Sequence, residues 1–369
     1  MQRIIENLRV DDHAMRYSQF VPRLYNYCCS LGFQRERMMP SRAFCSDESQ
    51  GYPVILIAQH FGTFPFDHGL IGGKVAIDRH GPHAHHGEDL VIVQASHVGY
   101  DPDTRRFGVY RRRRTADHEF GDNCGKLCAV LHWYQHEYHH ACEHILFGRL
   151  DGEPVVFVDN LFLDETRPEG LLLNLDLLID RNKGPLKTLS TSNVFRAAPA
   201  LVQKLPAETW RDMPEIIGRR LTADLFFFRR TATEGPLGHD LLETALGPAM
   251  TALVTSPHPA LDAARYHTQV EFDRTYRSIR REPIYRDKNL LFVSGINIDV
   301  SPRDGLPFPL TKFVPWAAYV RLRDGRSFHL EQNELTDTLR RQSVDNPDCM
   351  SFDASIQDMS EAEGVTIEI

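Results

Sequence analysis

Residues 90–97 read Leu-Val-Ile-Val-Gln-Ala-Ser-His. The run 90–95 is the clearest buried strand in the chain, because it is short, continuous and rich in β-branched side chains. His97 follows just beyond its predicted end. Open α/β sheets present their functional side chains at the carboxyl edge of the strands. This stretch therefore predicts an α/β sheet with a functional histidine at that edge.

Apolar spacing on both sides extends the α/β pattern along the chain. Helical periodicity predicts one or two amphipathic helices over 13–34, ending at Gly32, and a long helix over 124–147. Residues 54–58 fit either a strand or the start of a helix, and residues 171–179 are also ambiguous. Further expected elements are strands at 155–161 and 289–300, helices at 194–205 and 238–254, and a hairpin at 313–330. Because helices alternate with apolar strands, the predicted class is α/β, with N-terminal helices and a C-terminal strand and hairpin region.

Composition excludes several classes of protein. The chain has 369 residues, 42% of them hydrophobic, which is enough for a large core. Its formal net charge of -8 argues against a general nucleic-acid or anionic-membrane binder. No stretch approaches the roughly 20 apolar residues that span a bilayer. Seven cysteines, an odd number without a secretory signal at the N-terminus, favour reduced thiols in a cytoplasm over a disulfide framework.

Three residues are placed for a metal site. Cys45 ends an apolar stretch and is followed at once by polar residues, whereas a structural cysteine normally has apolar neighbours. His97 follows the strongest strand. Cys124 lies in Gly-Asp-Asn-Cys-Gly-Lys, at the predicted start of the long helix, where a thiolate is favoured. A catalytic zinc site takes three such ligands and keeps one position open. A lone histidine or cysteine more often has a packing or hydrogen-bonding role. The wide spacing of the three residues adds no motif-level specificity, so the pattern by itself leaves both interpretations open.

At these same residues the chain resembles the limiting carbon dioxide-inducible B/C proteins, a divergent group of β-type carbonic anhydrases. Blocks that resemble the family occur in the same order: Phe44-Cys45-Ser46-Asp47-Glu48, His68-Gly69-Leu70-Ile71-Gly72-Gly73, Ser96-His97-Val98-Gly99-Tyr100-Asp101, Phe107-Gly108-Val109-Tyr110-Arg111-Arg112, Asn123-Cys124-Gly125 and Ser294-Gly295-Ile296-Asn297-Ile298-Asp299. Two positions depart from the pattern, Ser96 for a proline and Lys126 for an alanine.

The resemblance implies a fold, a cofactor and a reaction. It implies a β-carbonic-anhydrase-like sheet flanked by helices, with Cys45, His97 and Cys124 binding Zn²⁺. The implied reaction is the reversible hydration of carbon dioxide to bicarbonate by zinc-bound hydroxide. It also implies a homodimer and a single catalytic domain over 1–369 with insertions, including a helical segment at about 1–40 and an acidic tail at about 345–369. Nucleic-acid and membrane partners are not expected.

Further catalytic roles come from the same resemblance. Asp47 is expected to orient the hydroxide by accepting its proton in a hydrogen bond. In many β-type enzymes an arginine four residues after the first cysteine holds this aspartate away from zinc, but the corresponding residue here is Ser49. Arg111 and Arg112 are the expected substitutes, since their run lies between two predicted ligands, His97 and Cys124.

Three other patterns leave alternatives open. His136, Glu137 and His140 fit the H-E-x-x-H pattern of zincin metalloproteases, on a predicted helix. His132, His136, His140 and His144 also recur every four residues, which is typical of a solvated or dimer-facing stripe. A histidine-rich loop, residues 80–86, is either an adventitious metal binder or a surface loop. Finally, a member of the same fold can lack turnover and only bind bicarbonate or a partner.

Overall fold

The computed structural model describes residues 1–70, 74–75, 89–111, 120–212, 221–231, 239–302 and 309–361. The chain divides into two compact units. The smaller unit comprises Met1–Arg3 and Leu127–Ala263, and the larger unit comprises Ile4–Lys126 and Ala264–Ile369. The expectation of one catalytic domain with insertions stays a prediction, because packing alone does not define which parts carry chemistry.

Within the described residues, the larger unit is built on an eight-stranded sheet in the order β1–β17–β16–β6–β2–β3, with β18 beside β17 and β7 beside β6. Its centre is parallel, since β6 runs parallel to both β16 and β2, and β17 joins antiparallel to β16. The strand bounds are β1 (Met15–Arg16), β2 (Met38–Ala43), β3 (Phe66–Asp67), β6 (Asp89–Asp101), β7 (Arg106–Phe107), β16 (Leu290–Val300), β17 (Lys312–Arg321) and β18 (Ser327–Leu330).

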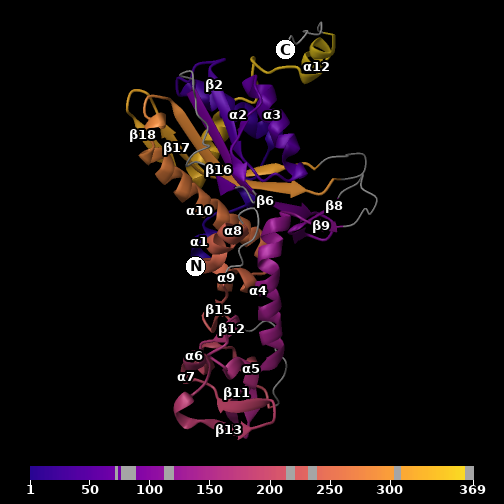
Figure 1. The fold of residues 1–369 in the computed structure, drawn as a ribbon, viewed down its shortest axis with the longest axis vertical. Helices are drawn as coiled ribbons and strands as arrows, with labels where there is room; N and C mark the ends of the chain where they lie inside the picture. The colour runs from indigo at the N-terminus through magenta and orange to yellow at the C-terminus, as the bar shows by residue number, and fades with distance from the viewer. Residues whose placement is uncertain are drawn as a thin grey trace, which may run out of the picture. The chain divides into compact units, whose positions relative to one another are not determined.

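Helices cover both faces of this sheet. One apolar core joins alternate residues of β6 and β16 to side chains of three helices, α2 (Tyr17–Ser30), α3 (Gly51–Phe61) and α11 (Gln332–Arg341). A second core joins the intervening residues of the same strands to α10 (Pro259–Arg281), seen beside the sheet in Figure 1. The alternation follows from the period-2 geometry of a strand and leaves both faces of β6 buried.

The remaining elements of the larger unit are short. They are the helices α1 (Gln2–Glu6) and α12 (Phe352–Glu361), the pair β4 (Gly69–Leu70) and β5 (Lys74–Val75), and the pair β8 (Val109–Arg111) and β9 (Phe120–Asp122). The long helix α4 (Gly125–His144) follows β9 along the chain.

The smaller unit contains a four-stranded antiparallel sheet in the order β10–β11–β14–β13 and a separate pair, β12 with β15, among its described residues. Their bounds are β10 (Ile145–Leu150), β11 (Glu153–Asp159), β12 (Gly170–Leu173), β13 (Pro185–Thr188), β14 (Ser192–Arg196) and β15 (Phe226–Arg229). Its helices after α4 are α5 (Asn160–Leu163), α6 (Leu175–Leu178), α7 (Pro199–Lys204), α8 (His239–Leu246) and α9 (Met250–Thr255). In the part of the chain that the structure describes, no helix is long and apolar enough to cross a membrane.

Several predicted boundaries are wrong, for identifiable reasons. Strand β6 does not end near Ala95 but continues to Asp101, because β16 pairs with it as far as Tyr100. His97 therefore lies within the strand and not beyond it. The ambiguous residues 54–58 are helical, inside α3. The helix predicted over 124–147 begins after Cys124 and ends at His144, because the residues from Ile145 onward pair with β11.

Candidate metal centre

Unequal strand lengths create the site. Strand β2 stops at Ala43, opposite Gln94 of β6, whereas β6 stays paired with β16 for another six residues, to Tyr100. Beyond the end of β2, the edge of β6 that had paired with β2 faces the loop that follows β2. Cys45 stands two residues after the end of β2 and His97 three residues after Gln94. The first two predicted ligands thus meet where one strand ends and its neighbour continues.

The polarity of β6 changes at His97. On the face toward α2 and α3, the successive residues Val91, Val93 and Ala95 belong to the apolar core. Asn297 of β16 pairs in register with His97, and Asp299 follows two residues later on the same strand. Because residues two apart in a strand share a face, His97, Asn297 and Asp299 lie together at the end of an apolar column.

Backbone hydrogen bonds bring the third residue into place. The N–H of Gly99 donates to the carbonyl of Asn123 (2.8 Å), and the N–H of Asn123 donates to the carbonyl of Gly108 (3.0 Å). A Cβ atom at residue 99 would lie 2.4 Å from the carbonyl oxygen of Val109, so only glycine allows this approach. Cys124 follows directly and is thereby held beside His97.

The three predicted ligands form one buried cluster. Their candidate donor atoms all lie within 4.8 Å of one another. Cys45 is 5% exposed, His97 1% and Cys124 0%. The two sulfurs are 3.9 Å apart, and neither cysteine is part of a disulfide. Two sulfurs that each lie about 2.3 Å from a tetrahedral zinc ion are separated by about 3.8 Å, so this spacing suits such an ion.

The imidazole of His97 has one engaged and one unengaged nitrogen. Nδ1 lies 2.9 Å from Oδ2 of Asp299. Because a carboxylate only accepts, Nδ1 carries a hydrogen, so in the neutral imidazole the lone pair is on Nε2. Nε2 is buried and makes no hydrogen bond within normal geometry among the described residues, and its polar neighbours are the thiols of Cys45 and Cys124. A buried nitrogen lone pair beside two thiols is the arrangement expected when a metal ion is the missing partner.

A polar network surrounds the Asp299 carboxylate. Oδ2 accepts from the hydroxyl of Ser49 (2.8 Å) and from the side-chain amide of Gln50 (2.8 Å). Oδ1 accepts from the hydroxyl of Thr311 (3.0 Å). Asn297 in turn donates to the Gln50 oxygen (2.6 Å). All these side chains are buried, so the carboxylate is fixed in position and its charge is compensated by hydrogen bonds.

The environment shifts the protonation of the cluster. The adjacent Cys45 thiol and burial raise the pKa of the Cys124 thiol well above its usual value. Burial by itself lowers the pKa of His97, but the charge of Cys124 and the hydrogen bond to Asp299 outweigh it and raise that pKa. A buried thiolate needs a compensating positive charge. A cation held by two thiolates and Nε2 of His97 supplies it, so the residues present fit a metal ion.

The predicted catalytic residues lie in different surroundings. Asp47 is half-buried, and its Oδ1 accepts a hydrogen bond from the N–H of Ser49 (3.1 Å) at the start of a short 3₁₀ turn. Arg111 lies 3.9 Å from the Asp103 carboxylate and stacks on the ring of Phe120 at 4.6 Å. Between described residues, no ion pair joins Arg111 to Asp47. Arg112 and the histidine-rich loop 80–86 lie outside the described residues.

The H-E-x-x-H residues do not assemble as a protease site requires. Glu137 accepts a hydrogen bond from the N–H of Leu171 (3.1 Å), and its Oε2 lies 3.6 Å from the Arg167 guanidinium. His136 belongs to neither of the two groups of potential metal ligands in the described chain. His140 belongs to the second of these groups, which lies in the smaller unit together with Glu143 and His144.

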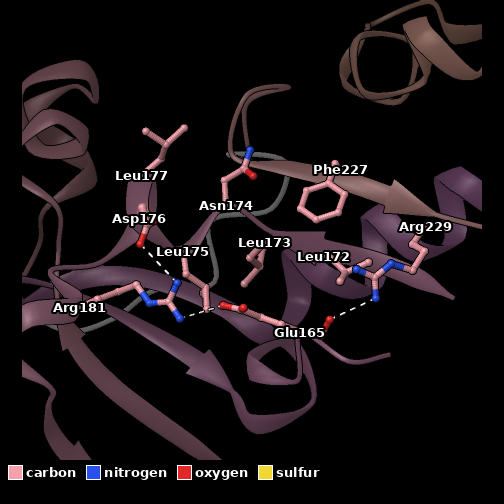
Figure 2. A pocket seen from close by; sticks show the side chains of 10 residues that line it. All are labelled: Glu165, Leu172, Leu173, Asn174, Leu175, Asp176, Leu177, Arg181, Phe227 and Arg229. Atoms are coloured by element: carbon pink, nitrogen blue, oxygen red, sulfur yellow. Dashed lines mark hydrogen bonds and ion pairs between the residues drawn. The ribbon is translucent and has the colours of Figure 1, made fainter. Parts of the chain in front are cut away.

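A separate pocket in the smaller unit does not offer free charges. It has a volume of about 490 Å³ and is lined by leucines and Phe227 together with two arginines (Figure 2). Arg181 is paired with Glu165 (2.9 Å) and Asp176 (3.3 Å). Arg229 donates to backbone carbonyls, including that of Glu165 (3.1 Å). Both guanidinium groups are therefore engaged by the protein itself.

Asp299, Gln50 and Asn297 shape the site, although no sequence pattern predicted a role for them. Asp299 lies 202 residues from His97 along the chain, so no local spacing connects them. The one available indication was the alternation of polar residues after Gly295 in a strand that is otherwise apolar.

Comparison with known proteins gives structural matches. No protein-family model matches the sequence, and no curated protein matches it. The crystal structure of PtLCIB4, a homologue of the limiting CO2-inducible protein LCIB, covers 90% of this chain and 99% of its own, with 12% identity and a TM-score of 0.50. A histidine-to-alanine mutant of PtLCIB4 covers 88% and 96%, with 12% identity and a TM-score of 0.50. The structure of LCIB itself covers 90% and 98%, with 13% identity and a TM-score of 0.46.

The two PtLCIB4 matches confirm the predicted resemblance at the level of the fold. The mixed α/β architecture with a largely parallel central sheet, flanked by helices, is the β-carbonic-anhydrase-like arrangement expected from the sequence. The chain therefore has the fold of PtLCIB4, a homologue of the limiting CO2-inducible protein LCIB.

Proposed function

We propose that this chain is a zinc-dependent carbonic anhydrase, which catalyses the reversible hydration of carbon dioxide to bicarbonate. The observation that carries the proposal is the buried cluster of Cys45, His97 and Cys124, whose candidate donor atoms lie within 4.8 Å of one another. The fold shared with a homologue of a CO2-inducible protein supports the choice of substrate. A zinc ion at this cluster would supply a hydroxide nucleophile near neutral pH by lowering the pKa of water.

The chain's own residues define the surroundings of the reaction. Asp299 fixes the ring of His97 through Nδ1, so that Nε2 faces the two thiols. Val93 and Ala95 line the same sheet face directly before His97, which makes that side apolar. An apolar wall suits carbon dioxide, which has no net charge, and it keeps water from the sheet side of the cluster.

We propose that Asp47 accepts the proton of the nucleophile in a hydrogen bond. The N–H of Ser49 already holds Oδ1 of Asp47, so a backbone amide restrains the carboxylate at the position where an arginine was expected. Arg111 and Arg112 remain proposed partners of this carboxylate. For Arg111 this role requires it to leave Asp103, a solvent-exposed partner, and such pairs are weak.

The test combines metal content with stopped-flow carbon dioxide hydration on the purified full chain. Wild-type protein should contain about one tightly held zinc per subunit. Cys124→Ser should lose both zinc and turnover, whereas Cys349→Ser, a change at an exposed cysteine, should keep both. Wild-type protein without zinc under reducing conditions, or full zinc occupancy in Cys124→Ser, would falsify the proposed centre.

Three further variants test the roles of the charged residues. Asp47→Ala should lose most of the turnover and keep its zinc, and one of Arg111→Ala or Arg112→Ala should behave similarly. If both arginine variants hydrate carbon dioxide at the wild-type rate, neither arginine restrains Asp47. Zinc-loaded wild type that lacks turnover would instead support a silent bicarbonate- or partner-binding protein. Light scattering on the same samples tests the homodimer, which stays a prediction.

A further inference from the structure

The last turn of α4 carries a second group of potential metal ligands. His140, Glu143 and His144 offer donor atoms that lie within 4.8 Å of one another. Residues three and four apart share one face of an α-helix, so the helix itself creates this grouping. The group overlaps the H-E-x-x-H pattern at its final histidine, His140, and extends one helical turn further along α4. It also lies in the smaller unit, whereas the Cys45–His97–Cys124 cluster lies in the larger one.

Neighbouring side chains hold the two imidazoles in place. The rings of His140 and His144 are 4.5 Å apart between centroids, and both lie near the buried ring of Phe162 in α5, at 5.7 Å and 6.4 Å. Nδ1 of His144 lies 3.6 Å from Oδ2 of Asp159, the last residue of β11. Ligands that are already positioned lose less conformational entropy when an ion binds.

The charges and donor types define the ion. Two neutral imidazoles with the carboxylates of Glu143 and Asp159 carry a net charge of about -2, which a divalent cation neutralises. Imidazole nitrogen favours zinc, cobalt, nickel and copper over magnesium and calcium, which prefer oxygen. The guanidinium of Arg167 lies over the ring of Phe162, 5.7 Å from its centroid, but this cation is already paired with Glu137.

We propose that His140, Glu143 and His144, with Asp159 as a further ligand, form an exchangeable binding site for a divalent transition-metal ion. The His144 side chain is 42% exposed, so the ion keeps contact with solvent and exchanges readily. Bound there, it links the end of α4 to the end of β11 and stabilises the smaller unit by mass action. The site is not a peptidase centre, because Glu137 is held by Leu171 and Arg167.

The experiment is a titration of the tag-free, purified full chain with Co²⁺, followed by calorimetry and by absorption. We expect about one equivalent of Co²⁺ with only weak d–d bands, since nitrogen and oxygen ligands give no thiolate band. Cobalt entering the Cys45–Cys124 cluster instead gives an intense thiolate-to-cobalt band. A failure of the zinc proposal is therefore distinguishable from a failure of this one.

Variants locate the added ion. The double variant His140→Ala/His144→Ala should no longer bind the equivalent of Co²⁺ that gives weak d–d bands. Glu143→Gln, a conservative change at an exposed residue, should weaken Co²⁺ binding about tenfold. The matched control His132→Ala/His136→Ala changes two histidines of the same helix and should bind as wild type. A variant with His80, His83, His85 and His86 replaced should also bind as wild type. Full binding by the first pair, loss of binding in the loop variant, or no added ion in wild type would overturn the proposal.

Discussion

Asp299 and His97 form a buried carboxylate–imidazole pair, with Oδ2 of one 2.9 Å from Nδ1 of the other. Both side chains are fully inaccessible to solvent. The carboxylate determines which nitrogen of His97 carries its hydrogen and raises the electron-donating power of the other nitrogen. We therefore expect Asp299 to tune how strongly Nε2 of His97 would bind the proposed metal ion.

The first prediction concerns this pair. Asp299→Asn removes the charge that orients His97 and should lower zinc affinity about 10- to 100-fold. Competition with a chromophoric chelator measures the affinity. The control is Thr311→Val, which removes only the hydrogen bond to Oδ1 of Asp299 and should change affinity much less. Equal affinity in Asp299→Asn and wild type would show that the carboxylate does not tune the ligand.

The second prediction concerns Gly99. A methyl group there would meet the carbonyl oxygen of Val109 at 2.4 Å and Cβ of Asn123 at 3.0 Å, directly before Cys124. Gly99→Ala should therefore destabilise the protein by roughly 1–3 kcal/mol and reduce zinc occupancy by displacing Cys124. Denaturant unfolding and metal analysis test this. Gly121→Ala is the control, because nothing lies within 4 Å of its new methyl group.

Local pattern was enough to predict part of the fold. The apolar run of β6, a helix within 13–34 and the hairpin at 313–330 each depend on neighbours in sequence. The structure has all three, although the helix is shorter than predicted and spans Tyr17–Ser30. Polar residues were misleading where a distant partner buries them. Oγ of Ser96 lies 2.9 Å from Nδ1 of His267 in α10, and Nδ1 of His97 lies 2.9 Å from Oδ2 of Asp299. Because these partners bury Ser96 and His97, the strand continues through two polar residues that in the sequence suggested its end.

Other features were not predicted because their cause lies far away in sequence. The helix α10 was missed, although it spans 23 residues, because its many charged positions hide the buried side chains Phe272 and Ile279. The ligand set was predicted through family blocks, since spacing alone left it open. Asp299 was not assigned, because its role exists only once β16 is paired in register with β6.

The third prediction concerns acid sensitivity at His68. Burial, with a contribution from the charge of Arg42, lowers the pKa of His68 from 6.5 to about 4. Between these two values the unfolded chain binds a proton that the folded protein does not. The free energy of unfolding should therefore be fully retained above pH 6.5 and fall as the pH drops toward 4, by at most roughly 3 kcal/mol.

Urea unfolding at a series of pH values measures this dependence. In His68→Leu the free energy of unfolding should fall less between pH 6.5 and 4, since no proton can bind at that position. His132→Gln, a change at an exposed histidine of α4, should leave the decline as in wild type. A His68→Leu profile with the same slope as wild type would assign the acid sensitivity to other groups.

The fourth prediction separates structure from catalysis at Glu137. Its carboxylate is 16% exposed, accepts from the N–H of Leu171 and pairs with Arg167, so it joins α4 to the start of β12. Glu137→Ala leaves a donor and a cation without their acceptor and should destabilise the protein by roughly 1–3 kcal/mol. Carbon dioxide hydration and zinc content should stay unchanged, because the cluster at Cys45 lies in the larger unit.

Glu137→Gln distinguishes this structural role from a catalytic one. The amide oxygen can still accept from Leu171 but cannot pair with Arg167 as a charge, so the stability loss should be smaller than in Glu137→Ala. The control is Glu143→Ala, measured with a chelator present, which removes an exposed glutamate of the same helix. It should change the free energy of unfolding only slightly. A protease base would give the opposite pattern, in which both Glu137 variants lose peptidase activity and neither loses stability.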